Sequence, residues 1–497
     1  GRLLLARDPF GEKPLYYVAT PAGVAFASEI KALRAAGALP DLGLCAEAID
    51  AYLAFTYIPA PRTIFRHVRK VPGGHCVVID LRGLASGAPD ATRTARYWKL
   101  PDRVGESADG SQMAAMLRDA LRRRCPPGEP AAVYLSGGLD SSVVVALAAR
   151  ESSRRLPTFS VGFKEAGLDE SAHARRVADL FHCDHHEILL DDVGPDLVTA
   201  VIDQLDEPMA DAATIPTWVL GREASTCARV ALTGDGADAL LAGDHWFRRL
   251  HRLDAMERLP RVVRAAIPVA AALSGPSRYR RYRDLVALID QKQAQRYLSI
   301  REKWGWRQRM EIYAEDFRRG VDLSATEGSY LLAPVDWRQG ESVDAAIRLD
   351  TMHGLPEDLL MKADKMGMAH GIESRTPFMD RRFAEWAARL EPGLLLRGSG
   401  SKYLLKKAAE ALLPRDLIYR RKHGFQVPVG RWLKGSLRGL TEAAFEPAMI
   451  GRQGLFDAEA LGRLEARFHR GPCSAALDGR VWQIVALQTW WRRVFEP

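Results

Sequence analysis

A glycine- and serine-rich run that follows a short apolar segment constrains this chain more than any other feature. Residues 131–135 are mostly apolar and lead into the run Ser136-Gly137-Gly138-Leu139-Asp140-Ser141-Ser142. Glycine permits a tight turn and a close approach of the backbone to an anion, and the free N–H groups at a helix start attract phosphate. A capped turn without a ligand is the simpler alternative, but the full run after a strand disfavours it. The run therefore predicts a strand, a phosphate-binding turn and a helix, with Asp140 offering oxygen to a magnesium ion.

The surrounding pattern indicates an α/β fold. Strand-like apolar runs at 131–135, 158–161, 186–190 and 229–232 alternate with helical periodicity at 112–124, 142–150, 172–180 and 196–205. Such alternation predicts a Rossmann-like parallel sheet with helices on both faces. Beyond residue 245 the pattern is mainly helical, so we expect a helical C-terminal part.

Composition divides the chain into three parts. Residues 1–82 are typical of strands and turns, with apolar runs at 3–6, 15–18, 24–27 and 76–79. Residues 83–105 are rich in Gly, Ala, Ser, Pro and Thr, which predicts a linker. Residues 106–497 contain the alternating and helical segments and are expected to form one unit.

Charge and cysteine content limit which partners and which cellular compartment are expected. The net charge is +8, and basic clusters occur at 122–124, 278–283 and 420–422. A basic surface could attract nucleic acid or acidic membranes, but no RNA-binding signature is present, so we favour solvated helix faces and expect no nucleic-acid partner. The apolar run 262–273 is interrupted by Arg264 and Pro268 and is expected to be a buried helix or turn rather than a membrane span. Six cysteines without a CxxC pair favour a reducing cytoplasm.

The glycine- and serine-rich run resembles the pyrophosphate loop of the N-type ATP pyrophosphatases. That superfamily adenylates a carboxylate or carbonyl and releases pyrophosphate; it includes asparagine, GMP and argininosuccinate synthetases and tRNA-modifying enzymes. The rest of the chain resembles the glutamine-hydrolysing asparagine synthetase family. The segments that carry this resemblance, in the family's order, are 159–163, 168–171, 174–178, 185–187, 206–208, 215–217, 232–238, 359–366, 371–380, 402–407 and 421–425 with Pro428.

Residues 6–17 and 26–33 resemble the rear half of the family's N-terminal-nucleophile glutaminase β-sandwich. That domain uses a cysteine at the mature N-terminus, activated by its own amine. Residue 1 is Gly, and none of the six cysteines stands at the nucleophile position. We therefore expect a fragment, or a naturally truncated protein, that lacks the glutaminase nucleophile.

The resemblance implies a role for each matched residue. ATP would be bound by Leu135, Ser136, Gly137, Gly138, Asp140, Ser141, Val161, Thr233 and Gly234. Asp140 and Asp238 would hold Mg²⁺ between the phosphates. Lys402 would meet the transferring phosphate, while Asp235 and Glu373 would orient substrate or assist proton removal from ammonia.

One segment departs from the family pattern. Family members usually read Asp-Glu-Leu-Phe-Gly-Gly-Tyr where this chain reads Asp238-Ala239-Leu240-Leu241-Ala242-Gly243-Asp244. The Glu, the first Gly and the Tyr are replaced, whereas the first Asp is kept. We expect these changes to alter the acceptor site more than the ATP site.

The leading functional hypothesis is adenylation of the aspartate side chain and attack by glutamine-derived ammonia, giving asparagine, AMP and pyrophosphate. A second hypothesis keeps the chemistry but uses another acceptor, in a polysaccharide or peptide natural-product pathway. A nucleic-acid-modifying enzyme is disfavoured by the glutaminase-like segment, and a non-catalytic relic by Asp140, Asp238 and Lys402 together. Small molecules are the expected partners, and a homodimer stays open.

Overall fold

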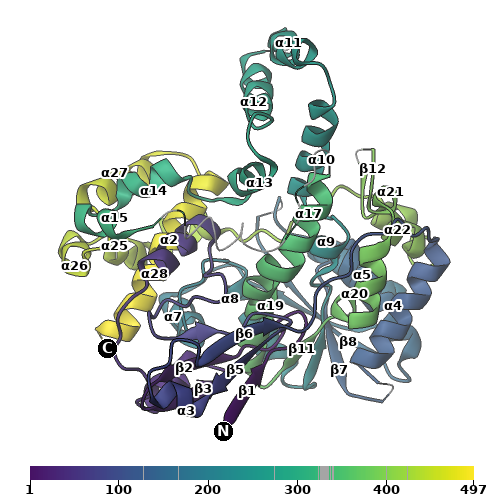
Figure 1. Ribbon diagram of the computed structural model, residues 1–497. Coiled ribbons are helices and arrows are strands. Elements are labelled where there is room, and N and C mark those ends of the chain that lie inside the picture. The colour runs from purple at the N-terminus through teal and green to yellow at the C-terminus, as the bar shows by residue number, and fades with distance from the viewer. Residues whose placement is uncertain are drawn as a thin grey trace.

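The described residues form one parallel sheet, three small antiparallel sheets and many helices (Figure 1). The computed structural model describes residues 1–126, 128–165, 167–273, 275–322, 324, 335, 337, 341–398, 400–422 and 424–496. None of the helices in these ranges is both long and apolar enough to cross a membrane. The predicted α/β fold with a helical C-terminal part is confirmed.

The central sheet has five parallel strands in the order β11-β10-β7-β8-β9. Their bounds are β7 Ala131–Tyr134, β8 Pro157–Gly162, β9 Asp184–Leu189, β10 Val230–Leu232 and β11 Glu373–Arg375. The strand order reverses between β7 and β10, and ligands of such sheets bind beyond the carboxyl ends of the strands at this reversal. The turn after β7 and the loop after β10 therefore lie side by side at the place where a ligand is expected.

Both faces of the central sheet are buried. Side chains alternate along a strand, so Val133 and Leu232 join one hydrophobic core while Ala132 and Ala231 join the other. The helices of this part are α4 Gly110–Arg124, α5 Leu139–Glu151, α6 Ser171–Leu180, α7 Pro195–Gln204, α8 Thr214–Ala224, α9 Ala237–Leu240, α18 Leu355–Glu357, α19 Leu359–Met368, α20 Arg381–Arg389 and α22 Tyr403–Ala409. The strands and helices expected between 112 and 232 are all present.

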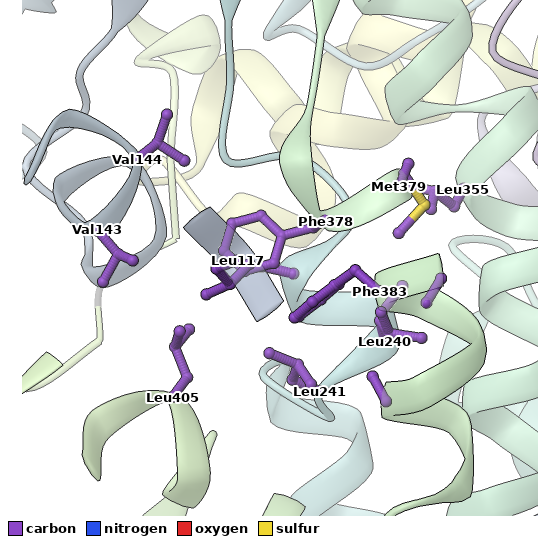
Figure 2. Close-up of a cluster of buried hydrophobic side chains, with 14 of the residues drawn as sticks. Leu117, Val143, Val144, Leu240, Leu241, Leu355, Phe378, Met379, Phe383 and Leu405 are labelled. Atoms are coloured by element: carbon purple, nitrogen blue, oxygen red, sulfur yellow. The ribbon is translucent and has the colours of Figure 1, made fainter. Parts of the chain in front are cut away.

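One of these cores supports the loops that follow β7 and β10. Figure 2 shows apolar side chains converging from α4, α5, α9, α18, α20 and α22 and from the short 3-10 helix η2 Pro377–Met379. Phe378 and Phe383 pack edge to face at 5.8 Å between ring centroids. Val143 of α5 and Leu240 of α9 both belong to this core, so Asp140 and Asp238, one helical turn or less away, are held on packed helices.

The N-terminal region contains two three-stranded antiparallel sheets. One has the order β1-β5-β6 and the other β3-β2-β4. The elements are β1 Arg2–Ala6, β2 Tyr16–Thr20, β3 Gly23–Ala27, α1 Ile30–Ala35, α2 Ala46–Phe55, β4 Arg69–Lys70, β5 His75–Asp80, α3 Leu81–Ala85 and β6 Thr92–Arg96. Leu5, Tyr17 and Val77 fill the space between the sheets, as expected for part of a sandwich.

The prediction of a linker at 83–105 is wrong for residues 92–96, which form strand β6. Strand β6 pairs with β5 along its whole length, from Thr92 opposite Ile79 to Arg96 opposite His75. The sequence did not indicate this strand because its side chains are mostly polar and exposed. Polar side chains of this kind are common on edge strands.

A helical projection rises from the body beyond the central sheet (Figure 1). It consists of α10 His245–Glu257, α11 Arg261–Ala272, α12 Pro276–Ala287 and α13 Gln293–Arg301. The apolar run 262–273 forms most of α11, but among its described side chains only Pro268 is buried. The expectation of a buried helix is therefore wrong, because α11 packs mainly on α12 and not on the body.

The remaining elements complete the C-terminal half. Their bounds are α14 Trp306–Ile312, α15 Glu315–Gly320, α17 Ser342–Leu349, the π-helix η1 Asp350–Gly354, α21 Pro392–Leu395, β12 Leu396–Arg397, β13 Gly400–Ser401, α23 Arg415–Ile418, α24 Val429–Lys434, α25 Arg438–Ala444, α26 Pro447–Gln453, α27 Ala458–Arg470 and α28 Ala475–Phe495. Helix α28 packs against α7, α24, α25 and α27. Its Gln483 donates to the backbone carbonyls of Tyr52 and Leu53 in α2, which ties the C-terminal helices to the N-terminal region.

Candidate active site

A cavity of about 1490 Å³ opens beyond the carboxyl ends of β7, β8 and β10. Its floor includes Tyr134, Ser160 and Thr233, which stand at or near the ends of these three strands. The cavity therefore occupies the position where parallel sheets of this strand order bind ligands.

The turn after β7 is shaped to hold an anion. Gly137 has a φ of 72°, and a Cβ there would lie 2.7 Å from the backbone nitrogen of Ala174, so only glycine fits. Gly138 is the N-cap of α5, and its N–H donates to Ser136 Oγ at 3.3 Å. The helix start therefore presents backbone N–H groups and serine hydroxyls to the cavity, as phosphate-binding turns do.

A second contact holds this turn from the C-terminal half. Arg420 donates from Nη2 to the carbonyl oxygen of Gly137 at 2.9 Å. Its Nη1 lies 2.7 Å from Glu170 Oε1, and both side chains also line the cavity. The position of the turn thus depends on a loop almost 300 residues further along the chain.

Lys402 lies between two carboxylates in the wall of the cavity. Its Nζ is 2.5 Å from Asp140 Oδ2 and 2.5 Å from Asp238 Oδ1. The side chain reaches them across Gly243, where an added Cβ would lie 2.1 Å from Lys402 Cε. Glycine is therefore required at 243, and it is the one glycine that the altered segment keeps. We call Asp140, Asp238 and Lys402 the strand-end cluster.

Burial and charge act in opposite directions within the strand-end cluster. Burial raises the pKa of Asp140 above its ordinary value, although Lys402 opposes the change. Burial would raise the pKa of Asp238 as well, but Lys402 and Lys422 hold it at about 2. Lys402 is buried, which favours the neutral amine, but the two carboxylates raise its pKa further than burial lowers it. The lysine therefore stays charged at neutral pH.

The strand-end cluster has the donor atoms that magnesium prefers. Asp140 Oδ1 is a buried oxygen without a hydrogen-bond partner, and Asp238 is the other carboxylate at the same lysine. Within the described ranges no group of three or more His, Cys, Asp or Glu side chains is placed to hold a metal. Magnesium at nucleotide sites commonly uses one or two carboxylates with phosphate oxygens and water, so these two residues fit a nucleotide-bound ion.

Residues 238–244, which depart from the family pattern, add further charged groups beside the strand-end cluster. Lys422 Nζ lies 2.5 Å from Asp238 Oδ1 and 3.0 Å from Asp244 Oδ1. Burial and the nearby Asp238 raise the pKa of Asp244 to about 6, against the effect of Lys422. Ala242, which replaces a glycine of the family pattern, has a φ of 53°, a conformation that strains residues with a Cβ. Asp244 thus contributes a carboxylate where the family has an aromatic ring.

A second group of charges lines the cavity away from the sheet. Lys362 Nζ of α19 lies 2.6 Å from Asp211 Oδ2, and Asp358 lies one helical turn before Lys362. Asp358 Oδ1 is buried without a hydrogen-bond partner. Burial and Asp211 raise the pKa of Asp358 to about 7, whereas Lys362 opposes the change. We call Asp211, Asp358 and Lys362 the helix cluster.

The wall beside the helix cluster contains a π-helix. Asp350, its first residue, accepts a hydrogen bond from Trp246 Nε1 at 2.7 Å and another from the Tyr297 hydroxyl. Arg301 lies over the Trp246 ring at 4.1 Å from its centroid, with its Nε 3.7 Å from Asp350 Oδ1. π-Helical turns occur often at functional sites, and here the turn places Asp350 and Gly354 in the cavity wall.

The structure brings most of the predicted residues together. The lining includes Leu135, Ser136, Gly138, Asp140, Ser141, Val161, Thr233, Gly234, Asp235, Asp238 and Lys402. Gly137 lies behind this surface and shapes the turn. Burial raises the pKa of Asp235, with Lys362 opposing, which suits a group that accepts a proton.

Glu373 is the exception among the predicted residues. It begins β11 and pairs with Val230, the first residue of β10, so it lies at the amino ends of the strands and does not line the cavity. Its carboxylate accepts from Arg375 Nη2 at 2.9 Å. The resemblance pointed to this residue, but the direction of β11 puts it at the end of the sheet opposite the cavity.

Sequence reasoning missed the helix cluster and Lys422 as site residues. Lys362 and Lys422 fall in segments that carry the family resemblance, 359–366 and 421–425, which was the available signal. Asp211 and Asp358 had no comparable signal. His423, in the second of these segments, lies outside the described residues.

Comparison with known proteins agrees with this geometry. A family model described as asparagine synthase matches residues 112–492, and a model described as glutamine amidotransferase domain matches residues 1–98. Asparagine synthetase [glutamine-hydrolyzing] 1 of Bacillus subtilis is 31% identical over 87% of this chain and 66% of its own length. A putative asparagine synthetase [glutamine-hydrolyzing] of Mycobacterium tuberculosis is 30% identical over 98% of this chain and 74% of its own length.

More distant relatives carry other names. Amidase chyE of Penicillium rubens is 25% identical over 88% of this chain and 69% of its own length. The chain thus spans about two thirds to three quarters of these relatives. Since the asparagine synthase model covers well over half of the sequence and the strand order and turn fit the ATP pyrophosphatase fold, this protein belongs to the asparagine synthase family of ligases.

Proposed function

We propose that this protein uses ATP to adenylate a carboxylate and then converts the acyl adenylate to an amide with ammonia. The observation that carries the proposal is the position of Lys402. It is a charged lysine between Asp140 and Asp238, beside a phosphate-binding turn, in a cavity large enough for two substrates. Such a group suits a reaction in which negative charge develops on a transferring phosphate.

The chemistry balances without an oxidant or reductant. A carboxylate oxygen of the acceptor attacks the α-phosphorus of ATP, the bond from that phosphorus to the bridging oxygen breaks, and pyrophosphate leaves. Ammonia then attacks the acyl carbon, AMP leaves with the former carboxylate oxygen, and one proton is lost. Asp235 is the proposed acceptor of that proton, because it lines the cavity and burial raises its pKa.

The nucleotide would lie over the sheet edge. Ser136, Gly138 and Ser141 would bind the phosphates through hydroxyl and N–H groups, while Leu135, Val161, Thr233 and Gly234 would border the adenosine. Asp140 and Asp238 would hold Mg²⁺, which neutralises charge on the phosphates when bound. Lys402 is then positioned to contact the α-phosphate or the leaving group.

The helix cluster and its neighbours would bind the acceptor. Lys362 and Arg301 offer positive charge, Asp211 offers negative charge, and Asp358 offers a carboxyl group whose pKa is raised to about 7; all four line the cavity. A substrate with both an amino and a carboxylate group matches this pattern, so aspartate, giving asparagine, is the first proposed acceptor.

A different acceptor is the second candidate, and one observation favours it. Ala239 and Asp244, which replace the Glu and Tyr of the family pattern, both line the cavity. An amide-forming step in a polysaccharide or peptide natural-product pathway would use the same chemistry on a larger carboxylate.

Glutamine is the proposed nitrogen source, because residues 1–98 match a glutamine amidotransferase domain. A cytoplasmic setting is part of the proposal, since all six cysteines are free. The synthetase reaction can be tested independently of glutamine by supplying ammonium.

The test measures pyrophosphate release from Mg-ATP with ammonium chloride and a panel of carboxylates, including aspartate. Release should require one carboxylate and should fall at least about a hundredfold in Asp140→Asn, because an ion and Lys402 both lose a partner. Asp90→Asn is the matched control, since Asp90 is exposed in a turn before β6. An Asp140→Asn variant that retains the parent rate would show that the site is assigned wrongly.

A further inference from the structure

The outer face of helix α11 is apolar. Val262, Ala266, Val269 and Leu273 follow one another at intervals of four, three and four residues, which places them on one face of the helix. That face points to solvent: the exposed fractions of Val262, Val269 and Leu273 are 82%, 66% and 93%. Surface helices normally turn their polar face toward solvent. Helix α11 instead exposes its apolar face.

The apolar surface is concentrated on this projection. In the described part of the chain, seven of the 19 exposed large apolar side chains lie between residues 259 and 282. Figure 1 shows α11 and α12 as the outermost elements of the projection, well away from the central sheet. Contiguous apolar surface of this kind marks an interaction site.

Charge selects the kind of partner. Residues 258–284 contain seven arginines and one acidic residue, Asp284, which pairs with Arg283 at 2.8 Å. Arg278 and Arg280 of α12 are exposed, and the half-exposed rings of Tyr279 and Tyr282 lie among them. A helix with an apolar face, neighbouring arginines and tyrosines is typical of segments that lie in the boundary between lipid headgroups and acyl chains.

We propose that the α11–α12 hairpin docks on an anionic lipid surface. Val262, Val269 and Leu273 would enter the acyl boundary, while Arg278 and Arg280 would contact the headgroups. The apolar face argues against nucleic acid, for which only the arginines would serve. An acidic protein would need a matching apolar groove, whereas a membrane offers both the apolar layer and the negative charge.

The same hairpin also borders the active-site cavity. Tyr282 and Leu285 of α12 and Arg252 of α10 line it. A docked hairpin would therefore hold one rim of the cavity at the membrane surface, where it could receive an acceptor carried by a lipid. The docking itself does not depend on the proposed function, and it is measured without substrate.

The test is flotation of the full chain with phosphatidylcholine vesicles, with and without phosphatidylglycerol. Binding should require phosphatidylglycerol and should weaken in high salt. Val262→Glu/Val269→Glu should lower partitioning at least about tenfold, and Arg278→Gln/Arg280→Gln should reduce the preference for phosphatidylglycerol. Val104→Glu is the matched control, because Val104 is equally exposed in a loop outside the projection. Circular dichroism and ammonium-dependent pyrophosphate release show that each variant is folded.

Three results would overturn the proposal. The parent chain fails to float with anionic vesicles, or Val262→Glu/Val269→Glu floats as well as the parent. In the third, light scattering shows a dimer that this double variant converts to a monomer, without vesicle binding by either protein. That result would assign the apolar face to a second copy of the chain.

Discussion

The strand-end cluster and the helix cluster lie in one cavity but are built in different ways. Asp140 and Asp238 lie on helices α5 and α9, which follow two neighbouring strands, and Lys402 reaches both across Gly243 with almost no spare room. The helix cluster joins Asp211, ahead of α8, to Lys362 on α19 across 151 residues of sequence. Its Asp358 keeps a buried oxygen without a hydrogen-bond partner.

The difference indicates which of the two clusters can change its substrate without loss of the reaction. At the strand-end cluster, close ion pairs and a required glycine fix the geometry, so substitutions there should abolish the proposed ATP chemistry. At the helix cluster, side chains from α19 and from the segments before α8 and α19 define the pocket, so substitutions there should change which acceptor is used. The four variants below test this division, beginning with the largest effect.

Replacing the central lysine should have the largest effect. Lys402→Gln removes the charge between Asp140 and Asp238, and we expect the turnover rate for pyrophosphate release to fall about 10²- to 10³-fold. Lys407→Gln is the matched control, because Lys407 lies on α22, the helix that Lys402 caps, but pairs with Glu410 at the surface. A Lys402→Gln variant with the parent rate would remove the reason for treating this cluster as the reacting centre.

A change in the helix cluster should separate acceptor from nucleotide. Lys362→Met removes a charged hydrogen-bonding group worth about 1.5–3 kcal/mol, so KM for the acceptor should rise about 10- to 100-fold while ATP affinity stays within about twofold. Lys365→Met, on the same helix, removes the 2.5 Å contact to Asp206 outside the cavity. This control should lose stability but keep its KM. If Lys362→Met weakened ATP binding as much as it raised KM for the acceptor, the proposed separation of the ATP and acceptor sites would be wrong.

Restoring the family's Glu and Tyr should also change how the acceptor is used. Ala239 is 8% exposed and lines the cavity, so a glutamate there would bring a new carboxylate to the wall. Asp244→Tyr removes a partner of Lys422. We expect Ala239→Glu/Asp244→Tyr to change the aspartate-dependent rate by about tenfold, with ATP affinity unchanged. Tighter ATP binding without a change in aspartate use would place the effect at the nucleotide site.

The smallest effect should be on stability. Since the pKa of Asp358 is raised from 3.8 to about 7, the folded protein holds a proton there that the unfolded chain releases. Its contribution to stability therefore falls as the pH rises through that window. Asp358→Asn cannot ionise and should be more stable than the parent at pH 8, by up to about 1.4 kcal/mol for each unit by which the pKa of Asp358 is raised, with a smaller difference at pH 5. Urea unfolding measures both, and a pH-independent difference would contradict the assignment.

The sequence predicted the parts that depend on local pattern. Apolar runs located β7, β8, β9 and β10, and the glycines after β7 marked the tight turn before α5, because these features follow from neighbours in the chain. Three-residue β11 and polar β6 carried no such pattern and depend on pairing with β10 and β5.

Other features depended on distant contacts. Helix α11 was expected to be buried because it is apolar, but burial requires neighbouring elements, and α11 packs mainly against α12. Glu373 matched a motif, but strand direction placed it away from the cavity. The helix cluster could not be found from spacing, since its members meet only after α8 and α19 pack together.

The most direct test follows an acceptor carboxylate labelled with ¹⁸O through one turnover with ATP and ammonium. Attack on the α-phosphorus transfers one acceptor oxygen to AMP, so mass spectrometry should find a single ¹⁸O in AMP and none in pyrophosphate. Label in inorganic phosphate with formation of ADP would show attack on the γ-phosphorus instead. That result would contradict adenylation at the strand-end cluster, which is the central claim about this site.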